Sequence, residues 1–380
     1  MKCPHCNFER EELFNFCPMC GTKMVNDEEL EQTVPVSEPQ PTEKIEQPKT
    51  VTIVRRIPNG FTETTYKERK EIRKLSRISG FSFLCLEFLA GIMIYIVLYG
   101  LMAFGFSEQR AVSIIEDPYF IQYFQIVASS FMFIVPFTFI YKLFGFKISK
   151  IINFNLPKTK NWFAIVLMGV GFCSFANIAT AIASNFFENY GIDYNVDFGE
   201  NPQGVFGIIL SILATAVVPA LVEEFACRGL VMGSLRKYGD GFAVLTSAIM
   251  FGFIHGNFTQ IPFAFMVGLI LGFVTVKSGS IWPAVLIHFY NNFSSVIFDY
   301  VFEGMAIELQ NVIYTFYLVI CLFIGILGVL LLRNNNEIFK LSNGDTEAGE
   351  GKKYKWYFLS ETIIFVIAVY LIESLQYFKF

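Results

Sequence analysis

The chain has 380 residues, of which 54% are hydrophobic and 16% are charged, and its formal net charge at pH 7 is −4. A soluble protein of this length rarely carries so much apolar surface, which here includes 44 phenylalanines, so the composition indicates a membrane protein. The slightly acidic balance gives no reason to expect a nucleic-acid partner.

Four cysteines lie near the N-terminus as two closely spaced Cys-x-x-Cys pairs. Two such pairs supply four thiolates for one tetrahedral zinc ion, so the spacing predicts a small zinc-ribbon domain over residues 1–23. The alternative, a pair of disulfides, needs an oxidising compartment. The predicted zinc ligands are Cys3, Cys6, Cys17 and Cys20.

Residues 24–66 are rich in Glu, Gln, Pro and Thr, a composition that cannot bury a core and predicts a disordered linker. The basic run 67–77 directly precedes the first apolar segment, as is typical of a cytoplasmic flank. We therefore assign residues 24–77 to a linker with a basic juxtamembrane end and residues 78–380 to a membrane domain. Since no apolar segment precedes Ile78, we expect no cleavable signal peptide.

Apolar segments fill most of the remaining chain. Most of them reach the ~20 residues that a spanning helix needs, but 242–256 is short and 356–378 contains two glutamates. We therefore predict an all-α polytopic membrane protein with about eight or nine transmembrane helices. The apolar segments are 78–106, 119–145, 161–186, 204–238, 242–256, 261–276, 281–302, 311–332 and 356–378.

Charge alternates along the connections between these segments. The connections after the second, fourth and eighth segments are rich in Lys and Arg, whereas those after the first and third are rich in Asp and Glu. Cytoplasmic connections carry the excess of positive charge, so the alternation predicts a cytoplasmic N-terminus. We expect an integral, multi-pass protein of a bacterial cell membrane, with the lipid bilayer as its surroundings.

Three polar elements interrupt the apolar segments between residues 204 and 302. Ionisable groups in a bilayer interior cost several kcal/mol each, and for this reason they are rare and usually functional. A set of two Glu, one Arg, two His and one Asn can activate water in a buried site. The elements are Glu223-Glu224 with Arg228, then His255, then His288 with Asn292.

A glycine-rich stretch at 237–241 predicts a turn between two of these helices. Glu223 and His255 are equally far along the sequence from Gly239, so an antiparallel helical hairpin would place both about 24 Å from the turn. A carboxylate and an imidazole can therefore face each other across the hairpin.

Two pairs of polar residues are four positions apart and therefore share one helix face. Glu224 and Arg228 form one pair and predict an internal ion pair, which is compatible with a purely structural role or a catalytic one. His288 and Asn292 form the other. Pro219 precedes the glutamates and is expected to kink their helix, which could admit water.

These residues carry a resemblance to a known family. The stretch EEFACR at 223–228 resembles the E-E-x-x-x-R motif of the CPBP family, the CAAX proteases and bacteriocin-processing enzymes also called Abi proteins. FGFIH at 251–255 is similar to its F-x-x-x-H motif, and HFYNN at 288–292 to its H-x-x-x-N motif. The three motifs occur in the family's order, and the resemblance covers about residues 204–302.

The resemblance implies an intramembrane endopeptidase that hydrolyses a peptide bond of a membrane-associated protein or peptide. Glu223 would be the general base that activates the attacking water, with His255 as its partner. His288 and Asn292 would hold the tetrahedral oxyanion, as a donor such as Asn can.

The resemblance also implies that Glu224 and Arg228 support this geometry. An active-site metal stays open, because two His and one Glu match a catalytic zinc set while the family has also been interpreted as metal-free glutamate proteases.

Two other functions remain as alternatives. One is a non-proteolytic scaffold on the same membrane domain, acting in bacteriocin immunity or envelope regulation. The other is a proton-coupled transporter that uses Glu223 and the two histidines as a relay, which predicts inverted repeats that we do not find in the sequence.

Overall fold

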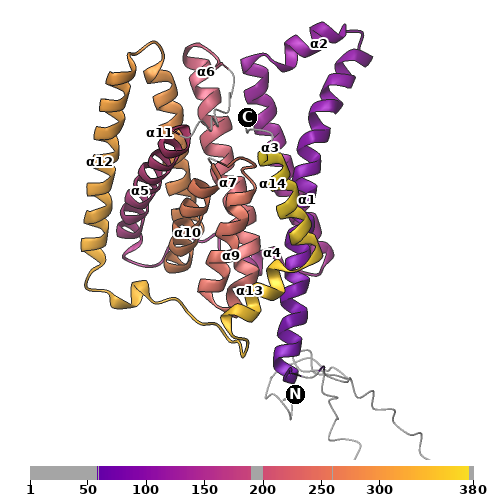
Figure 1. Ribbon diagram of the computed structural model, residues 1–380, viewed down its shortest axis with the longest axis vertical. Helices are drawn as coiled ribbons and strands as arrows, with labels where there is room; N and C mark the ends of the chain where they lie inside the picture. The colour runs from indigo at the N-terminus through magenta and orange to yellow at the C-terminus, as the bar shows by residue number, and fades with distance from the viewer. Residues whose placement is uncertain (1–57, 59, 190–199, 259, 376–380) are drawn as a thin grey trace, which may run out of the picture. The chain divides into compact units, whose positions relative to one another are not determined.

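The computed structural model describes residues 58, 60–189, 200–258 and 260–375 of the chain. The predicted zinc ribbon and most of the predicted linker lie outside these residues. The described residues belong to one compact unit, and all of their regular elements are helices (Figure 1). The fold class is therefore all-α, as predicted from the sequence.

The membrane domain consists of long helices joined by short connections. In chain order its elements are α1 (Glu63–Ala103), α2 (Glu108–Ile115), α3 (Pro118–Leu143), α4 (Ile148–Ile151), α5 (Trp162–Asn189), α6 (Gly204–Ser211), the π-helical η2 (Ile212–Val217), α7 (Val218–Glu224), the π-helical η3 (Phe225–Met232), α8 (Gly233–Leu235), η4 (Arg236–Tyr238), α9 (Asp240–Phe253), α10 (Gln260–Ser278), α11 (Trp282–Phe302), α12 (Ile307–Leu332), η5 (Asn336–Phe339), α13 (Glu350–Phe358) and α14 (Glu361–Leu375).

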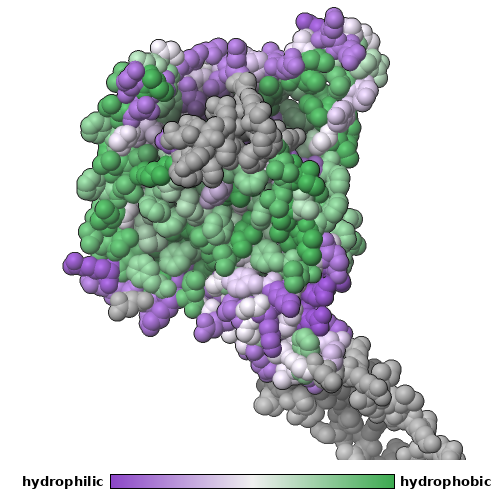
Figure 2. Space-filling view, viewed as in Figure 1, coloured by the Kyte–Doolittle hydropathy of each residue, from purple (hydrophilic) through white to green (hydrophobic). Residues whose placement is uncertain are grey.

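Six described helices are long and apolar enough to cross a membrane, and the chain is a multi-pass integral membrane protein. The number becomes seven if α13 and α14, which are bent by 70° at their junction, count as one span. An apolar band crosses the visible face of the described domain, with hydrophilic residues at both ends (Figure 2). The six are α1, α3, α5, α10, α12 and the continuous helical stretch Gly204–Tyr238.

By helix length and composition, the described residues therefore provide six or seven candidate spans, fewer than the eight or nine crossings predicted from the sequence. Each of the nine apolar segments is helical over most of its described residues. The last is divided between α13 and α14, and α9 has only 14 residues and is too short to span alone. α11 has 21 residues, yet it is not among the candidate spans, and the polar side chains of His288, Asn291 and Asn292 lower its hydropathy.

The first helix begins earlier than the sequence patterning predicted. α1 starts at Glu63, so residues 63–77, which we assigned to the linker, are helical. The hydroxyl of Thr62 accepts a hydrogen bond from the backbone N–H of Thr65, and the Thr65 hydroxyl accepts one from the N–H of Thr62. This capping box satisfies N-terminal donors of the helix, which explains why helical structure begins in a polar segment.

Small residues allow α5 and α12 to pack closely. A Cβ added at Gly171 of α5 would lie 2.4 Å from the Cα of Gly325 in α12, so the two backbones touch at these glycines. Gly328, one turn further along α12, faces the backbone of α5 at Met168 in the same way. Close helix contact through small residues is a usual packing mode in membranes, where burial from water contributes little.

The elements that carry the polar motifs lie centrally, between α1, α3 and α14 on one side and α5 and α12 on the other (Figure 1). Gly239, with φ of 122°, forms the turn between η4 and α9 and confirms the predicted turn. The backbone N–H of Asp240 donates to Ser342 O at 2.8 Å, and the N–H of Asp345 donates to Lys237 O at 3.0 Å. The segment before α13 therefore holds the hairpin turn in place.

Candidate active site

The two adjacent glutamates lie at the end of α7, between the π-helical stretches η2 and η3. Pro219 sits in the first turn of α7, where its missing N–H interrupts the regular hydrogen-bond ladder. The π-helical η2 gives way to the α-helical α7 directly before Pro219, so the helical register changes at this point. Gly204–Tyr238 nevertheless remains one continuous candidate span. π-helical turns inside α-helices are frequent at functional sites.

Glu224 and Arg228 form the ion pair that their spacing predicts. Arg228 Nη1 donates to Glu224 Oε1 at 2.8 Å, and both side chains are fully buried. The guanidinium also donates through Nη2 to Gly268 O of α10 at 3.3 Å and lies 4.0 Å above the ring of Phe251 from α9. This pair therefore joins three helices at the centre of the domain.

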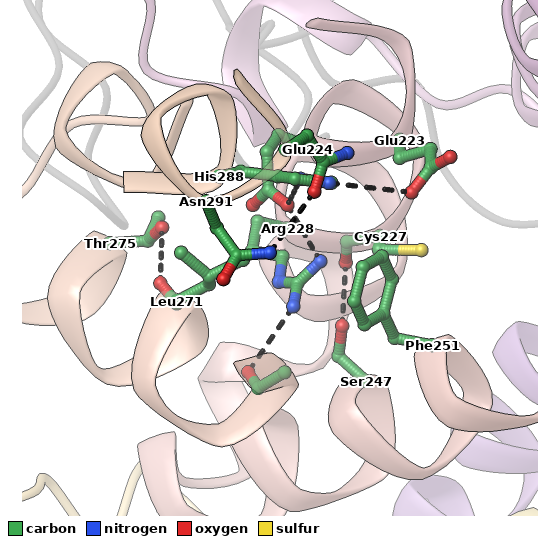
Figure 3. A network of polar contacts seen from close by, with 12 residues as sticks. Glu223, Glu224, Cys227, Arg228, Ser247, Phe251, Leu271, Thr275, His288 and Asn291 are labelled. Atoms are coloured by element: carbon green, nitrogen blue, oxygen red, sulfur yellow. Dashed lines mark hydrogen bonds and ion pairs between the residues drawn. The ribbon is translucent and has the colours of Figure 1, made fainter. Parts of the chain in front are cut away.

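His288 of α11 lies between the two glutamates (Figure 3). Its Nδ1 is 3.0 Å from Glu224 Oε1 and its Nε2 is 3.9 Å from Glu223 Oε2. Because a carboxylate oxygen only accepts hydrogen bonds, Nδ1 carries the proton in the contact with Glu224. In the neutral ring, Nε2 is then an acceptor on the side of Glu223.

Glu223 is the more accessible of the two glutamates, with 17% of its side chain exposed. In the described part of the chain its Oε2 atom is nevertheless buried without a hydrogen-bond partner, as are Glu224 Oε2 and Arg228 Nε. Buried polar atoms are nearly always paired with protein or water. A water bonded to both Glu223 Oε2 and His288 Nε2 would lie beside the 3.9 Å line that joins them, about 2.8 Å from each atom.

His255 lies just beyond α9, which ends at Phe253, and not within the helix of the predicted hairpin. Its Nδ1 is 2.8 Å from Phe251 O, and its ring packs edge-on against that of Phe251. The Phe251 ring also packs edge-on against His288, with centroids 5.7 Å apart. Among the described contacts, the imidazole paired with Glu223 is thus that of His288, and His255 joins the cluster through Phe251.

Asn292 lies one turn after His288 on α11, and its amide is already engaged. Its Nδ2 donates to Thr215 O in η2 at 3.0 Å, and its Oδ1 accepts from Asn291 Nδ2 at 3.2 Å. Asn177 of α5 donates in turn to Asn291 Oδ1 at 3.4 Å. Sequence reasoning missed Asn291 and gave Asn177 no role, because a single amide in an apolar segment does not reveal which helix it faces.

The donors at this site offer fewer metal ligands than a catalytic zinc requires. Glu223 and His288 could supply two, but no group of three His, Cys, Asp or Glu side chains within the described residues is arranged to hold a metal ion. Catalytic zinc sites use three protein ligands. The four N-terminal cysteines lie outside the described residues.

An apolar groove of about 570 Å³ opens beside the site, between α7 and α11. Ala220 and Leu221 contribute from α7, one turn before the glutamates, and Phe289 contributes from α11, next to His288. Trp162 and Trp282 line the same space. The groove and the polar cluster are thus built on the same two helices.

Comparison with known proteins shows that this region resembles a known protein family. Residues 205–294 match the family model described as type II CAAX prenyl endopeptidase Rce1-like. The chain is also 27% identical over 103 residues to the protein named "Putative membrane peptidase YdiL" of Bacillus subtilis (strain 168). That match covers 26% of this chain and 42% of the relative.

No solved structure matches the chain. The family match contains all three polar motifs, from Glu223 to Asn292. Over residues 205–294 the chain is therefore similar to the Rce1-like CAAX prenyl endopeptidases.

Proposed function

We propose that the chain is an intramembrane endopeptidase in which Glu223 activates a water molecule to hydrolyse a peptide bond of a membrane-associated protein or peptide. The observation that carries this proposal is the unpartnered, buried Oε2 of Glu223, 3.9 Å from His288 Nε2. The match of residues 205–294 to a peptidase family supports it independently.

In the proposed reaction, the Glu223 carboxylate accepts a proton from water as the water oxygen attacks the carbonyl carbon of the substrate. The C–N bond of the resulting tetrahedral intermediate then breaks, and the proton passes from Glu223 to the leaving amine nitrogen. The products are a carboxylic acid, which keeps the second proton of the water, and an amine, so atoms and charge balance. A general base of this kind contributes about 10²–10⁴-fold to the rate.

The other polar residues would prepare this step. Arg228 neutralises Glu224, which holds His288 through Nδ1 and aims Nε2 toward Glu223. The buried position of this network strengthens its electrostatic interactions. Asn292 would donate to the oxyanion of the intermediate. His255, held by the carbonyl of Phe251, would present its Nε2 as an acceptor near the same cluster.

The groove between α7 and α11 supports a substrate that approaches within the membrane. Its lining is apolar and lies one helical turn from the glutamates, so it suits an apolar group close to the cleaved bond. The alternating basic connections support a cytoplasmic N-terminus. The paired cysteines at 3–20 support a structural zinc in the N-terminal segment.

Comparative membrane proteomics tests the proposal in cells. Cells that express the wild-type chain should accumulate cleaved fragments of at least one membrane-associated protein, and cells that express Glu223→Gln should retain the uncleaved form. The matched control is Glu308→Gln, which makes the same substitution at an exposed glutamate in the first turn of α12. Identical peptide profiles in the wild type and Glu223→Gln would favour the non-proteolytic scaffold.

A further inference from the structure

Three asparagines form a directed series of hydrogen bonds across the membrane domain. Asn177 of α5 donates to Asn291 Oδ1 at 3.4 Å, Asn291 donates to Asn292 Oδ1 at 3.2 Å, and Asn292 donates to Thr215 O at 3.0 Å. The series begins at Asn177, and this side chain is held by a further hydrogen bond, which its Nδ2 donates to Cys173 O at 3.1 Å. The series runs from α5 through α11 to η2.

Both ends of this series are backbone carbonyls, which determines its direction. A carbonyl only accepts, so Asn177 and Asn292 must each present an amide nitrogen to it, and neither side chain can flip without losing that bond. Asn291 is then held by its neighbours, with its Oδ1 toward Asn177 and its Nδ2 toward Asn292. An unpaired amide in apolar surroundings is costly, so the contacts define one arrangement for all three side chains.

The bond to Thr215 connects the series with the helix that carries the glutamates. Thr215 lies in η2, directly before α7. In a π-helical stretch the backbone bonds do not follow the α-helical register, and Asn292 supplies a donor to one of its carbonyls. The position of Asn292 is therefore tied to the helix of Glu223 as well as to its own.

One donor of Asn292 remains without a described use. Its carboxamide has two N–H groups, of which one is given to Thr215 O, while its oxygen accepts from Asn291. Asn292 shares a helix face with His288, four residues before it. The second N–H is thus a donor that the described hydrogen bonds leave for a ligand, on a residue one turn from His288.

We propose that Asn177 and Asn291 are positioning residues, which hold the carboxamide of Asn292 so that its second N–H can donate to the oxyanion of the tetrahedral intermediate. This inference rests on the proposed hydrolytic function. Without Asn291, the Asn292 carboxamide retains one of its two described bonds, to Thr215 O, so one restraint fewer opposes a turn that would point its oxygen at the negative charge. The series acts through Asn292 alone, and neither Asn177 nor Asn291 touches the substrate.

A double-mutant cycle tests the inference on the full-length protein in liposomes, with an internally quenched farnesylated CAAX peptide as the probe. Asn177→Leu should lower kcat by about 3- to 10-fold, the loss typical of one hydrogen bond, and leave KM within about twofold. Combined with Asn292→Ala, it should cause no further loss. The matched control is Ser174→Ala, which removes a buried hydroxyl from the same helix, whose described hydrogen bond is to Val170 O.

The cycle separates this inference from the proposed function. Additive losses in the double variant, or a change confined to KM, would show that Asn177 does not act through Asn292. Wild-type activity of Glu223→Gln would instead overturn the proposed hydrolytic mechanism.

A second measurement does not depend on activity. In protein labelled with ¹⁵N at asparagine, Asn177→Leu should shift the side-chain amide signals of both Asn291 and Asn292, whereas Ser174→Ala should not. Unchanged Asn292 signals in Asn177→Leu would contradict the inference even if the probe peptide is not cleaved.

Discussion

His288 Nε2 lies 3.9 Å from Oε2 of Glu223, although the two residues come from helices that are distant in sequence. The ring is held from its other nitrogen by Glu224, which is itself neutralised by Arg228. The ion pair of Glu224 with Arg228 and the proposed base Glu223 thus share one histidine. This arrangement is compatible with both roles that the spacing of Glu224 and Arg228 left open.

The first prediction concerns the coupling between these groups. His288→Ala should lower the cleavage rate strongly, and its effect should be non-additive with Glu223→Gln, because both side chains would act on one water. His255→Ala should couple more weakly to Glu223→Gln, since its described contacts are with Phe251. Rates can be compared by mass spectrometry of products after long incubation. A stronger coupling for His255 would restore the pairing expected from the sequence.

The second prediction concerns stability. Arg228→Met leaves the Glu224 carboxylate buried without its cation, which should destabilise the fold by about 3–5 kcal/mol. Glu224→Gln/Arg228→Met removes both charges and should recover part of that loss. Thermal unfolding in detergent measures both variants. A double variant that is less stable than Arg228→Met alone would show that the pair does not behave as a unit.

Much of this arrangement follows from the sequence. Apolar length predicted all nine helical segments, glycines predicted the turn at Gly239, and spacing within one helix predicted the bond between Glu224 and Arg228. Each of these features depends on residues close to one another along the chain.

The features that sequence could not supply depend on how helices are rotated against one another. Periodicity places His288 and Asn292 on one face of α11, but it does not state that this face meets both the glutamates and η2. For the same reason Asn177 could not be assigned to the site. The helical start at Glu63 was missed because its stabilising cap is local and polar, whereas the assignment relied on apolar patterning.

The third prediction concerns the contact between α5 and α12. Gly325→Leu should force these helices apart, because a Cβ at this position would lie 2.5 Å from Gly171 Cα. Overpacking of this kind costs about 1–3 kcal/mol and should lower the unfolding temperature. Gly100→Leu is the control, since a Cβ at Gly100 of α1 meets nothing within 4 Å. Equal stability of the two variants would contradict the close helix contact.

The fourth prediction concerns zinc. Purified full-length protein should contain one zinc per chain by elemental analysis, and Cys3→Ser/Cys6→Ser should remove it, because half of the four thiolates would be lost. Cys173→Ser, which replaces a buried cysteine in α5, should retain the metal. Zinc that persists in the double-cysteine variant but disappears in His288→Ala would instead place a metal at the membrane site.

The central claim, that Glu223 is the general base, is tested most directly by the cleavage rate of Glu223→Gln in liposomes. The amide is nearly isosteric with the carboxylate but cannot accept the proton of water, so the account predicts a loss of at least about 10²–10⁴-fold, with folding and membrane insertion retained. Glu308→Gln, at an exposed glutamate of α12, should cleave the same peptide at the wild-type rate. A Glu223→Gln protein that is as active as Glu308→Gln would contradict the account.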